Sequence, residues 1–192
     1  MINPLEALKV IELHRASSVV VPTMQSNVRW SLVSSRPDLD LPLTGCMGKA
    51  SSLALGLALA QPKTKVIVID GDGSLLMNLG TLVTIGEQAP SNLIHISFDN
   101  GVYATTGSQP VPGSHTVDFA ECAKSSGYRS TCEFEHLEDF ISSVEDLFTQ
   151  EGPIFINLKI QEDLDCLSAD ERMASRATLV ASYPAMKSLF AS

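Results

Sequence analysis

The sequence lacks the features that would place a chain in a membrane or send it out of the cell. No apolar run is long enough to span a bilayer, because even SSLALGLALA is followed at once by Gln61, Pro62 and Lys63. The first residues carry acidic side chains among apolar ones, without the basic start and unbroken apolar core of a signal peptide. The sequence therefore predicts a cytoplasmic chain without a membrane anchor.

Positive charge and paired cysteines are also scarce. The chain has 13 Lys and Arg against 22 Asp and Glu, a formal net charge of -9, and no cluster of basic residues. Nucleic acids and acidic membrane surfaces attract basic patches, so the composition argues against both partners. The four cysteines contain no CxxC pair, which disfavours zinc, iron–sulfur and dithiol sites. They are expected to be buried or incidental thiols, and they are Cys46, Cys122, Cys132 and Cys166.

What is present is enough apolar sequence for one domain with a core. The chain has 192 residues, of which 44% are hydrophobic. We find no internal repeat, low-complexity tract or linker. Residues 1–192 are therefore expected to form a single domain.

Helical and strand patterns alternate along the chain. Helices are expected at about 4–15, 26–35, 48–60, 76–88, 117–126 and 136–149, followed by a polar C-terminal helical segment. Strands are expected at 17–23, 65–70, 92–98, 128–134 and 153–159, with a loop at 99–116. The run KVIVID is apolar throughout, as in a central strand covered on both faces. The order predicts an α/β fold with a doubly wound, mostly parallel sheet and helices on both faces.

Polar residues follow two of these strands, where such sheets bind ligands. Asp72 comes just after KVIVID, and Asn100 follows the strand at 92–98. A carboxylate, an amide oxygen and a loop carbonyl such as that of Val102 suit magnesium, with ligand phosphates completing its coordination. Asp70 is assigned no ligand role, because it can simply cap the loop.

The same loop has the composition of a phosphate cradle. Gly71 and Gly73 leave room for a ligand close to the backbone. Ser74 opens the following helix, whose free N–H groups attract anionic oxygens. Asp-Gly is also common in ordinary turns, so this signal depends on the second motif that follows.

The spacing of the two motifs resembles that of a known cofactor site. GDG at 71–73 is followed by 25 residues and then DN at 99–100, which resembles the thiamine diphosphate motif. The longer stretches GCMGKASSLALGLALAQPKTKVIVIDGDGSLLMNLGTLVTIG and FDNGVYATTGSQP are similar to the pyrophosphate-binding half of sulfopyruvate and phosphonopyruvate decarboxylases. The resemblance extends over roughly residues 4–160 and implies the thiamine diphosphate-binding fold.

The resemblance implies a role for each matching position. Asp72 and Asn100 would be side-chain ligands of Mg²⁺, and Val102 a carbonyl ligand. Gly73 and Ser74 would hold the diphosphate.

Two further segments match positions around the reacting part of the cofactor. Met47, between two glycines in GCMG, would be the apolar residue that bends the cofactor, although it can also be core filler. The Gly45 carbonyl would accept a hydrogen bond from the aminopyrimidine. Thr106, Gly107 and Gln109, in the matching loop ATTGSQP, would line the substrate side.

The remaining candidate residues have modest signals. His95 lies within an apolar strand and is expected in the core, while His14 and His136 are assigned structural or surface roles. His115, in a loop, is the one histidine considered as an acid or base toward a substrate. Cys46 would lie near the cofactor.

Several positions depart from the resembled pattern. Lys49 stands where relatives commonly have histidine, and Asp99 replaces the first Asn of the usual pair. The C-terminal part lacks the basic, Gly-containing segment of phosphonopyruvate relatives. Arg172 and Arg176 are candidates for a cationic contact with an anionic group on the substrate.

The resemblance also implies a partner. Family enzymes use a glutamate on a pyrimidine-binding domain, which this chain is expected to obtain from a separate subunit of similar size. We therefore expect a hetero-oligomer with at least two copies of each chain, inactive as the lone polypeptide, that converts a 2-oxo acid into CO₂ and an aldehyde.

Two other functions remain open. The first is half of another thiamine diphosphate enzyme, either a carboligase or a 2-oxo acid oxidoreductase. The absence of cysteine clusters counts against the ferredoxin-linked oxidoreductases. The second is a non-catalytic cofactor-binding protein.

Overall fold

The computed structural model of the chain describes residues 1–162 and 179–190. Helices and strands alternate within these residues, as the sequence predicts. The strands are β1 (Val19–Pro22), β2 (Val66–Gly71), β3 (Leu93–Asp99), β4 (Val102–Tyr103), β5 (Gln109–Pro110), β6 (Ser130–Phe134) and β7 (Ile154–Lys159). The α-helices are α1 (Pro4–His14), α2 (Met24–Val33), α3 (Ala50–Ala60), α4 (Asp72–Leu76), α5 (Thr81–Gln88), α6 (Phe119–Ser125), α7 (Leu137–Thr149) and α9 (Leu179–Phe190).

Five of the strands form one parallel sheet, in the order β1-β2-β3-β7-β6. Every neighbouring pair in it is parallel. Because all five strands run in the same direction, their carboxyl ends lie at one edge of the sheet, where ligands bind in such folds. The predicted doubly wound α/β fold is confirmed.

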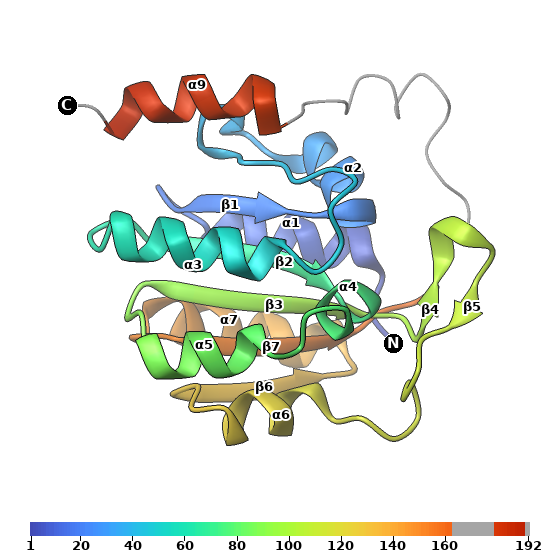
Figure 1. The fold of residues 1–192 in the computed structure, drawn as a ribbon. Coiled ribbons are helices and arrows are strands. Elements are labelled where there is room, and N and C mark those ends of the chain that lie inside the picture. Colours follow the sequence, from blue (N-terminus) through green and yellow to red (C-terminus); the bar gives the residue numbers. More distant parts are fainter. Residues whose placement is uncertain (163–178, 191–192) are drawn as a thin grey trace.

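Helices cover both faces of this sheet (Figure 1). Successive residues of a strand point to opposite faces, so neighbours in β2 enter different clusters. Val68 packs with apolar side chains of α3, α5 and α6, whereas Ile67 packs with those of α1, α2 and α7. The continuous apolar run of β2 is therefore explained by burial on both sides. None of the described helices combines the length and apolar character that a membrane crossing needs.

Two segments differ from the sequence prediction. The helix expected at 76–88, with Ser74 at its start, begins earlier, at Asp72, and is divided into α4 and α5. Between the two helices the Asn78 side chain donates to the Gly48 carbonyl oxygen at 3.0 Å. The loop expected at 99–116 contains a 3₁₀ helix at Ala104–Thr106 between β4 and β5, which pair as a short antiparallel hairpin. The first difference coincides with a contact between distant residues, and the second with a local hairpin.

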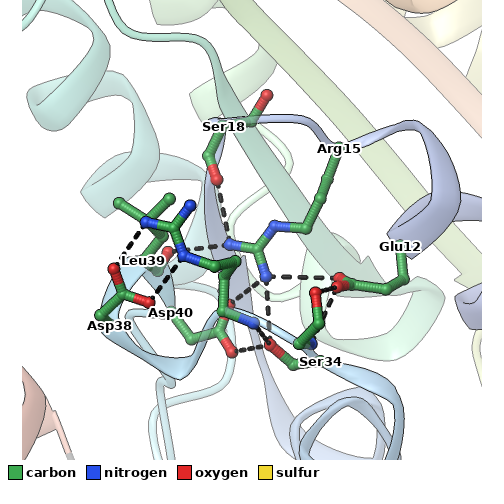
Figure 2. A network of polar contacts seen from close by, with 9 residues as sticks. Glu12, Arg15, Ser18, Ser34, Asp38, Leu39 and Asp40 are labelled. Carbon is green, nitrogen blue, oxygen red and sulfur yellow. Dashed lines mark hydrogen bonds and ion pairs between the residues drawn. The ribbon is translucent and has the colours of Figure 1, made fainter.

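A buried ion-pair network fixes the chain just after α2. The Arg15 guanidinium donates to Asp40 at 2.8 Å and to the Ser34 hydroxyl at 3.1 Å, and it also reaches Glu12 (Figure 2). It lies 5.3 Å from the centre of the Trp30 ring. Arg15 is only 2% exposed, so these partners offset the cost of burying its charge.

The segment that this network holds then runs beside β1. The N–H groups of Leu41 and Leu43 donate to the carbonyl oxygens of Val20 and Pro22, at 2.8 and 2.9 Å. These bonds carry the chain toward the carboxyl edge of the sheet. The GCMG segment at 45–48 follows directly.

The cysteines of the described part are free thiols, but none of them is buried. Cys46 is exposed, while Cys122 and Cys132 are half-buried. Cys166 lies outside the described residues, as do the two arginines proposed for anion binding, Arg172 and Arg176.

Candidate functional site

A pocket opens at the carboxyl edge of the sheet, among the residues that follow β1, β2, β3 and β7. It contains all but one of the residues for which the sequence predicts cofactor or metal binding. These are Met47, Gly71, Asp72, Gly73, Ser74, Asn100, Val102 and Thr106. Gly45 is exposed and is absent from the pocket lining. The fold thus brings together residues that are up to 59 positions apart, from Met47 to Thr106.

Asp72 is the most unusual of these side chains. It is the first residue of α4 and is only 4% exposed. Its Oδ2 accepts a hydrogen bond from the Gly101 N–H at 2.8 Å. Burial, followed by the nearby charge of Asp99, raises the pKa of Asp72 to about 7. A cation in the pocket would favour the charged carboxylate and lower this pKa.

Asn100 and Val102, which both carry oxygen atoms suited to a metal, line the same pocket. The Asn100 side-chain oxygen accepts from the Val102 N–H at 3.1 Å, which makes a tight local turn. One carboxylate, one amide oxygen and one carbonyl are hard oxygen donors of the kind that Mg²⁺ takes. The described residues contain no group of three or more His, Cys, Asp or Glu side chains suited to a metal. The residues present therefore fit a cation that phosphate oxygens help to hold.

The glycines of the predicted cradle are tightly constrained. A Cβ atom built on Gly73 would lie 2.4 Å from Cε1 of the Tyr103 ring. Gly71 and Gly73 both border the pocket, so their small size keeps backbone accessible there. The Ser74 hydroxyl accepts from the Gly48 N–H at 3.0 Å. This bond joins the predicted cradle to the GCMG segment.

Met47 and Gly45 differ in their surroundings. Met47 is half-buried and lines the pocket. Gly45 has a φ of 75°, and a Cβ atom there would have no neighbour within 4 Å. Cys46 between them is exposed. The wedge role of Met47 and the carbonyl role of Gly45 stay predictions.

The loop after β4 lines the pocket with Ala104, Thr105 and Thr106 rather than with the three residues expected. Thr106 lines the pocket, but Gly107 and Gln109 do not. Gln109 donates to the Thr106 carbonyl oxygen at 2.8 Å and accepts from its hydroxyl at 3.1 Å. Gln109 thus holds the loop in shape. His115 is exposed and lies outside the pocket lining, so nothing in this geometry favours its role as an acid or base.

Asp70 and His95, which were interpreted as structural residues, make structural contacts near the site. Asp70 caps the loop, since its Oδ1 accepts from the Gly71 N–H at 2.9 Å. His95 is fully buried, and its Nδ1 lies 3.0 Å from the Tyr128 hydroxyl. Both belong to the core beneath the pocket.

Asp99 is supported from the neighbouring strand. Lys159 of β7, its register partner, places Nζ 2.6 Å from Asp99 Oδ2. The Asn157 side chain donates to the same oxygen at 3.1 Å. The departure from the usual Asn at this position is therefore accompanied by a cation that neutralises the new carboxylate.

The first turns of α2 are a part of the site that the sequence prediction missed. Thr23, Met24, Gln25, Ser26 and Arg29 line the pocket, as do Tyr103 and Gln161. Met24 has a φ of 50°, which is uncommon for a residue other than glycine and is typical of functional sites. The sequence does place a helix just after the strand at 17–23, which could have pointed to a ligand site at the start of that helix. The helix was predicted to begin at residue 26, so residues 23–25 were not considered. No glycine marked the turn at Met24.

Known proteins are similar to this chain in sequence and in fold. Phosphonopyruvate decarboxylase of Streptomyces viridochromogenes is 38% identical over 150 residues, which are 78% of this chain and 37% of that protein. Sulfopyruvate decarboxylase subunit beta of Methanothermobacter thermautotrophicus is 42% identical over 119 residues, 62% of this chain and 60% of that subunit. The crystal structure of benzoylformate decarboxylase from Polynucleobacter necessarius aligns with a TM-score of 0.72 at 20% identity, covering 86% of this chain and 34% of that one.

These similarities concern part of each relative. The chain spans less than two thirds of the length of both decarboxylases that it matches. The family model described as "Thiamine pyrophosphate enzyme, C-terminal TPP binding domain" matches residues 26–158, which contain β2, β3 and the pocket residues that follow them. Because this match extends over more than half of the chain, the protein belongs to the thiamine pyrophosphate enzymes, through their C-terminal TPP binding domain.

Proposed function

We propose that the protein is the thiamine diphosphate- and Mg²⁺-binding subunit of a 2-oxo acid decarboxylase, acting on a substrate of the sulfopyruvate or phosphonopyruvate kind. The observation that carries the proposal is a buried carboxylate, Asp72, that lines the same pocket as Asn100 and Val102 in a chain of this family. The names of the relatives supply the reaction class.

Each pocket residue has a proposed task. Asp72, Asn100 and Val102 hold Mg²⁺ through oxygen atoms. The backbone around Gly71 and Gly73 receives the diphosphate, beside the Ser74 hydroxyl.

Three more residues act on the other end of the cofactor. Met47 would support the bent shape of the cofactor, and the Gly45 carbonyl would accept a hydrogen bond from its aminopyrimidine. Thr106, which lines the pocket, would contact the substrate. The bound cofactor itself supplies an electron-accepting ring, so that the bond to the leaving CO₂ can break, and an aldehyde is released.

The protein is proposed to act with a second kind of chain. The similarity to relatives that are named subunit beta of sulfopyruvate decarboxylase supports a partner. The partner would supply the pyrimidine-binding half and its activating glutamate. We propose a hetero-oligomer with at least two copies of each chain, in which the lone polypeptide is inactive.

Native mass spectrometry tests this proposal. The tagged chain is purified from its own cells in buffer with Mg²⁺ and thiamine diphosphate, and CO₂ release is measured with sulfopyruvate, phosphonopyruvate and pyruvate. We expect a second type of chain, one cofactor per pair of chains, and activity that Asp72→Ala removes. Condensation of two 2-oxo acids without an aldehyde would indicate a carboligase instead. A homo-oligomer without cofactor would contradict the proposal.

A further inference from the structure

Arg29 is a buried cation in a pocket proposed for an anion. It lies on α2, is 8% exposed and borders the cavity together with Asp72, Gly73 and Asn100. Among the described residues that line this cavity, it is the sole Lys, Arg or His. Arg29 lies outside every motif that the sequence analysis singled out.

The net charge expected in the occupied pocket is negative, and a cation at the position of Arg29 would reduce it. A diphosphate ester carries roughly three negative charges near neutral pH, because a terminal phosphate is about doubly ionised. Mg²⁺ neutralises two of these charges, while the ionised Asp72 that binds the metal adds one. Asp99 contributes a further carboxylate nearby, already paired with Lys159. The remaining negative charge is partly buried, where it is stabilised by a fixed cation.

Arg29 is also held in place relative to the pocket. Gln25 and Arg29 are four residues apart on α2, so both project from the same face of the helix. Arg29 Nη1 lies 3.4 Å from Gln25 Oε1, and Gln25 Nε2 donates to the Thr105 hydroxyl at 3.1 Å. This chain of contacts links α2 to the 3₁₀ helix at 104–106, across residues that line the pocket.

We propose that Arg29 binds the terminal phosphate of thiamine diphosphate and so distinguishes the diphosphate from its monophosphate. The planar guanidinium offers paired N–H donors that match phosphate oxygens. The inference rests on the proposed function, because it assumes that this pocket receives the cofactor. An anionic group on the substrate has the same oxyanion chemistry, and the experiment separates the two.

Calorimetric titration of the purified assembly provides the test. Thiamine diphosphate and thiamine monophosphate are each titrated in the presence of Mg²⁺ into wild type, Arg29→Met and a control, Arg129→Met. Arg129 is exposed and pairs with Glu151, and neither residue lines the pocket. We expect Arg29→Met to bind the diphosphate at least about tenfold more weakly, as for loss of a charge-assisted hydrogen bond, with monophosphate affinity unchanged. The control should match wild type.

Other results would overturn the inference. Unchanged affinities in Arg29→Met would do so, and so would an equal loss for both thiamine esters. A variant that keeps its diphosphate affinity but has a raised KM for sulfopyruvate, and not for pyruvate, would assign Arg29 to the substrate instead. If wild type binds no diphosphate, the proposed function fails, whatever the variants do.

A second measurement does not depend on the folding of a variant. The side-chain Nε–H resonance of Arg29 in wild type is followed by NMR as each ester is added with Mg²⁺. We expect a shift with the diphosphate and none with the monophosphate. The same response to both esters, or none to either, would overturn the inference.

Discussion

Two buried carboxylates show how this chain treats structure and binding differently. Asp40 and Asp72 are both less than 10% exposed, and burial is the largest cause of the raised pKa of each. Asp40 receives hydrogen bonds from Arg15 and from the Ser34 hydroxyl, at 2.8 and 2.5 Å (Figure 2). Asp72 accepts from a backbone N–H and lies near a second carboxylate, Asp99.

The difference lies in where the balancing charge comes from. For Asp40 it comes from Arg15, within the fold. For Asp72, no ion pair with a cation is found in the described part of the chain. A carboxylate that the fold buries without a cation is suited to a cation that arrives from outside. The same residue type thus anchors a loop in one region and lines a pocket without a paired cation in the other.

Breaking the Asp40 pair should have the largest effect on stability. Arg15→Met leaves a buried carboxylate without its cation, and the expected loss is about 3–5 kcal/mol of unfolding free energy. Urea denaturation measures it. The double variant Arg15→Met/Asp40→Leu, which removes both charges, should recover most of the loss. A single variant as stable as wild type would contradict the role given to this network.

Removing the other carboxylate should act on binding rather than on folding. We expect Asp72→Ala to weaken Mg²⁺-dependent binding of thiamine diphosphate by more than about a hundredfold, beyond the loss usual for a residue that only supports a ligand. Its unfolding midpoint in urea should not fall below that of the cofactor-free wild type. Unchanged affinity in a calorimetric titration would remove Asp72 from the site.

The close contact between Gly73 and the Tyr103 ring gives a second test of the difference between the structural and the binding region. Gly73→Ala forces its methyl group against the Tyr103 ring, with an expected cost of about 1–3 kcal/mol and weaker cofactor binding. Gly56→Ala in α3 is the matched control, because a Cβ atom there meets nothing within 4 Å. The control should be stabilised by about 0.5–1 kcal/mol, as for Gly to Ala within a helix. Denaturation curves for both variants decide whether the crowding matters.

The smallest predicted effect is on pH dependence. Since the pKa of Asp72 is about 7 in the cofactor-free protein, this carboxyl is largely protonated at pH 6 and ionised at pH 8. Metal binding needs the ionised form, so cofactor affinity should fall about tenfold from pH 8 to pH 6. The diphosphate itself also titrates in this range, but it does so equally when it binds Asp72→Asn. The smaller pH dependence of cofactor affinity expected for Asp72→Asn therefore serves as the reference. Identical profiles would contradict the assignment.

The same shift predicts how the stability of the free protein changes with pH. The folded state binds more protons than the unfolded state between the ordinary pKa of 3.8 and about 7. Stability of the cofactor-free wild type should therefore fall relative to Asp72→Asn as the pH rises through this range. Mg²⁺ with cofactor should reverse the trend.

The sequence predicted those parts of the molecule that depend on neighbouring residues. The apolar runs at 65–70 and 92–98 indicated central strands, and the parallel order brought the residues after them to one pocket. Asp72 and Asn100 could be singled out because each directly follows a strand.

The rest depended on contacts between distant residues. The Arg15 pair with Asp40 joins positions 25 apart, and Asn78 interrupts a predicted helix in order to reach Gly48. The positive φ of Met24 could not be predicted from the sequence, because such a turn is usually signalled by a glycine and none stands here. Arg29 became a candidate only once the fold placed it beside the pocket.

The central claim is that Asp72 and its neighbours hold Mg²⁺ and the diphosphate of the cofactor. The most direct test is a titration of thiamine diphosphate into the purified assembly, once with Mg²⁺ and once after removal of divalent cations with a chelator. The account predicts saturable binding of one cofactor per chain of this kind with Mg²⁺, and its loss after chelation. Binding that persists without divalent cations, or that fails with them, would contradict it.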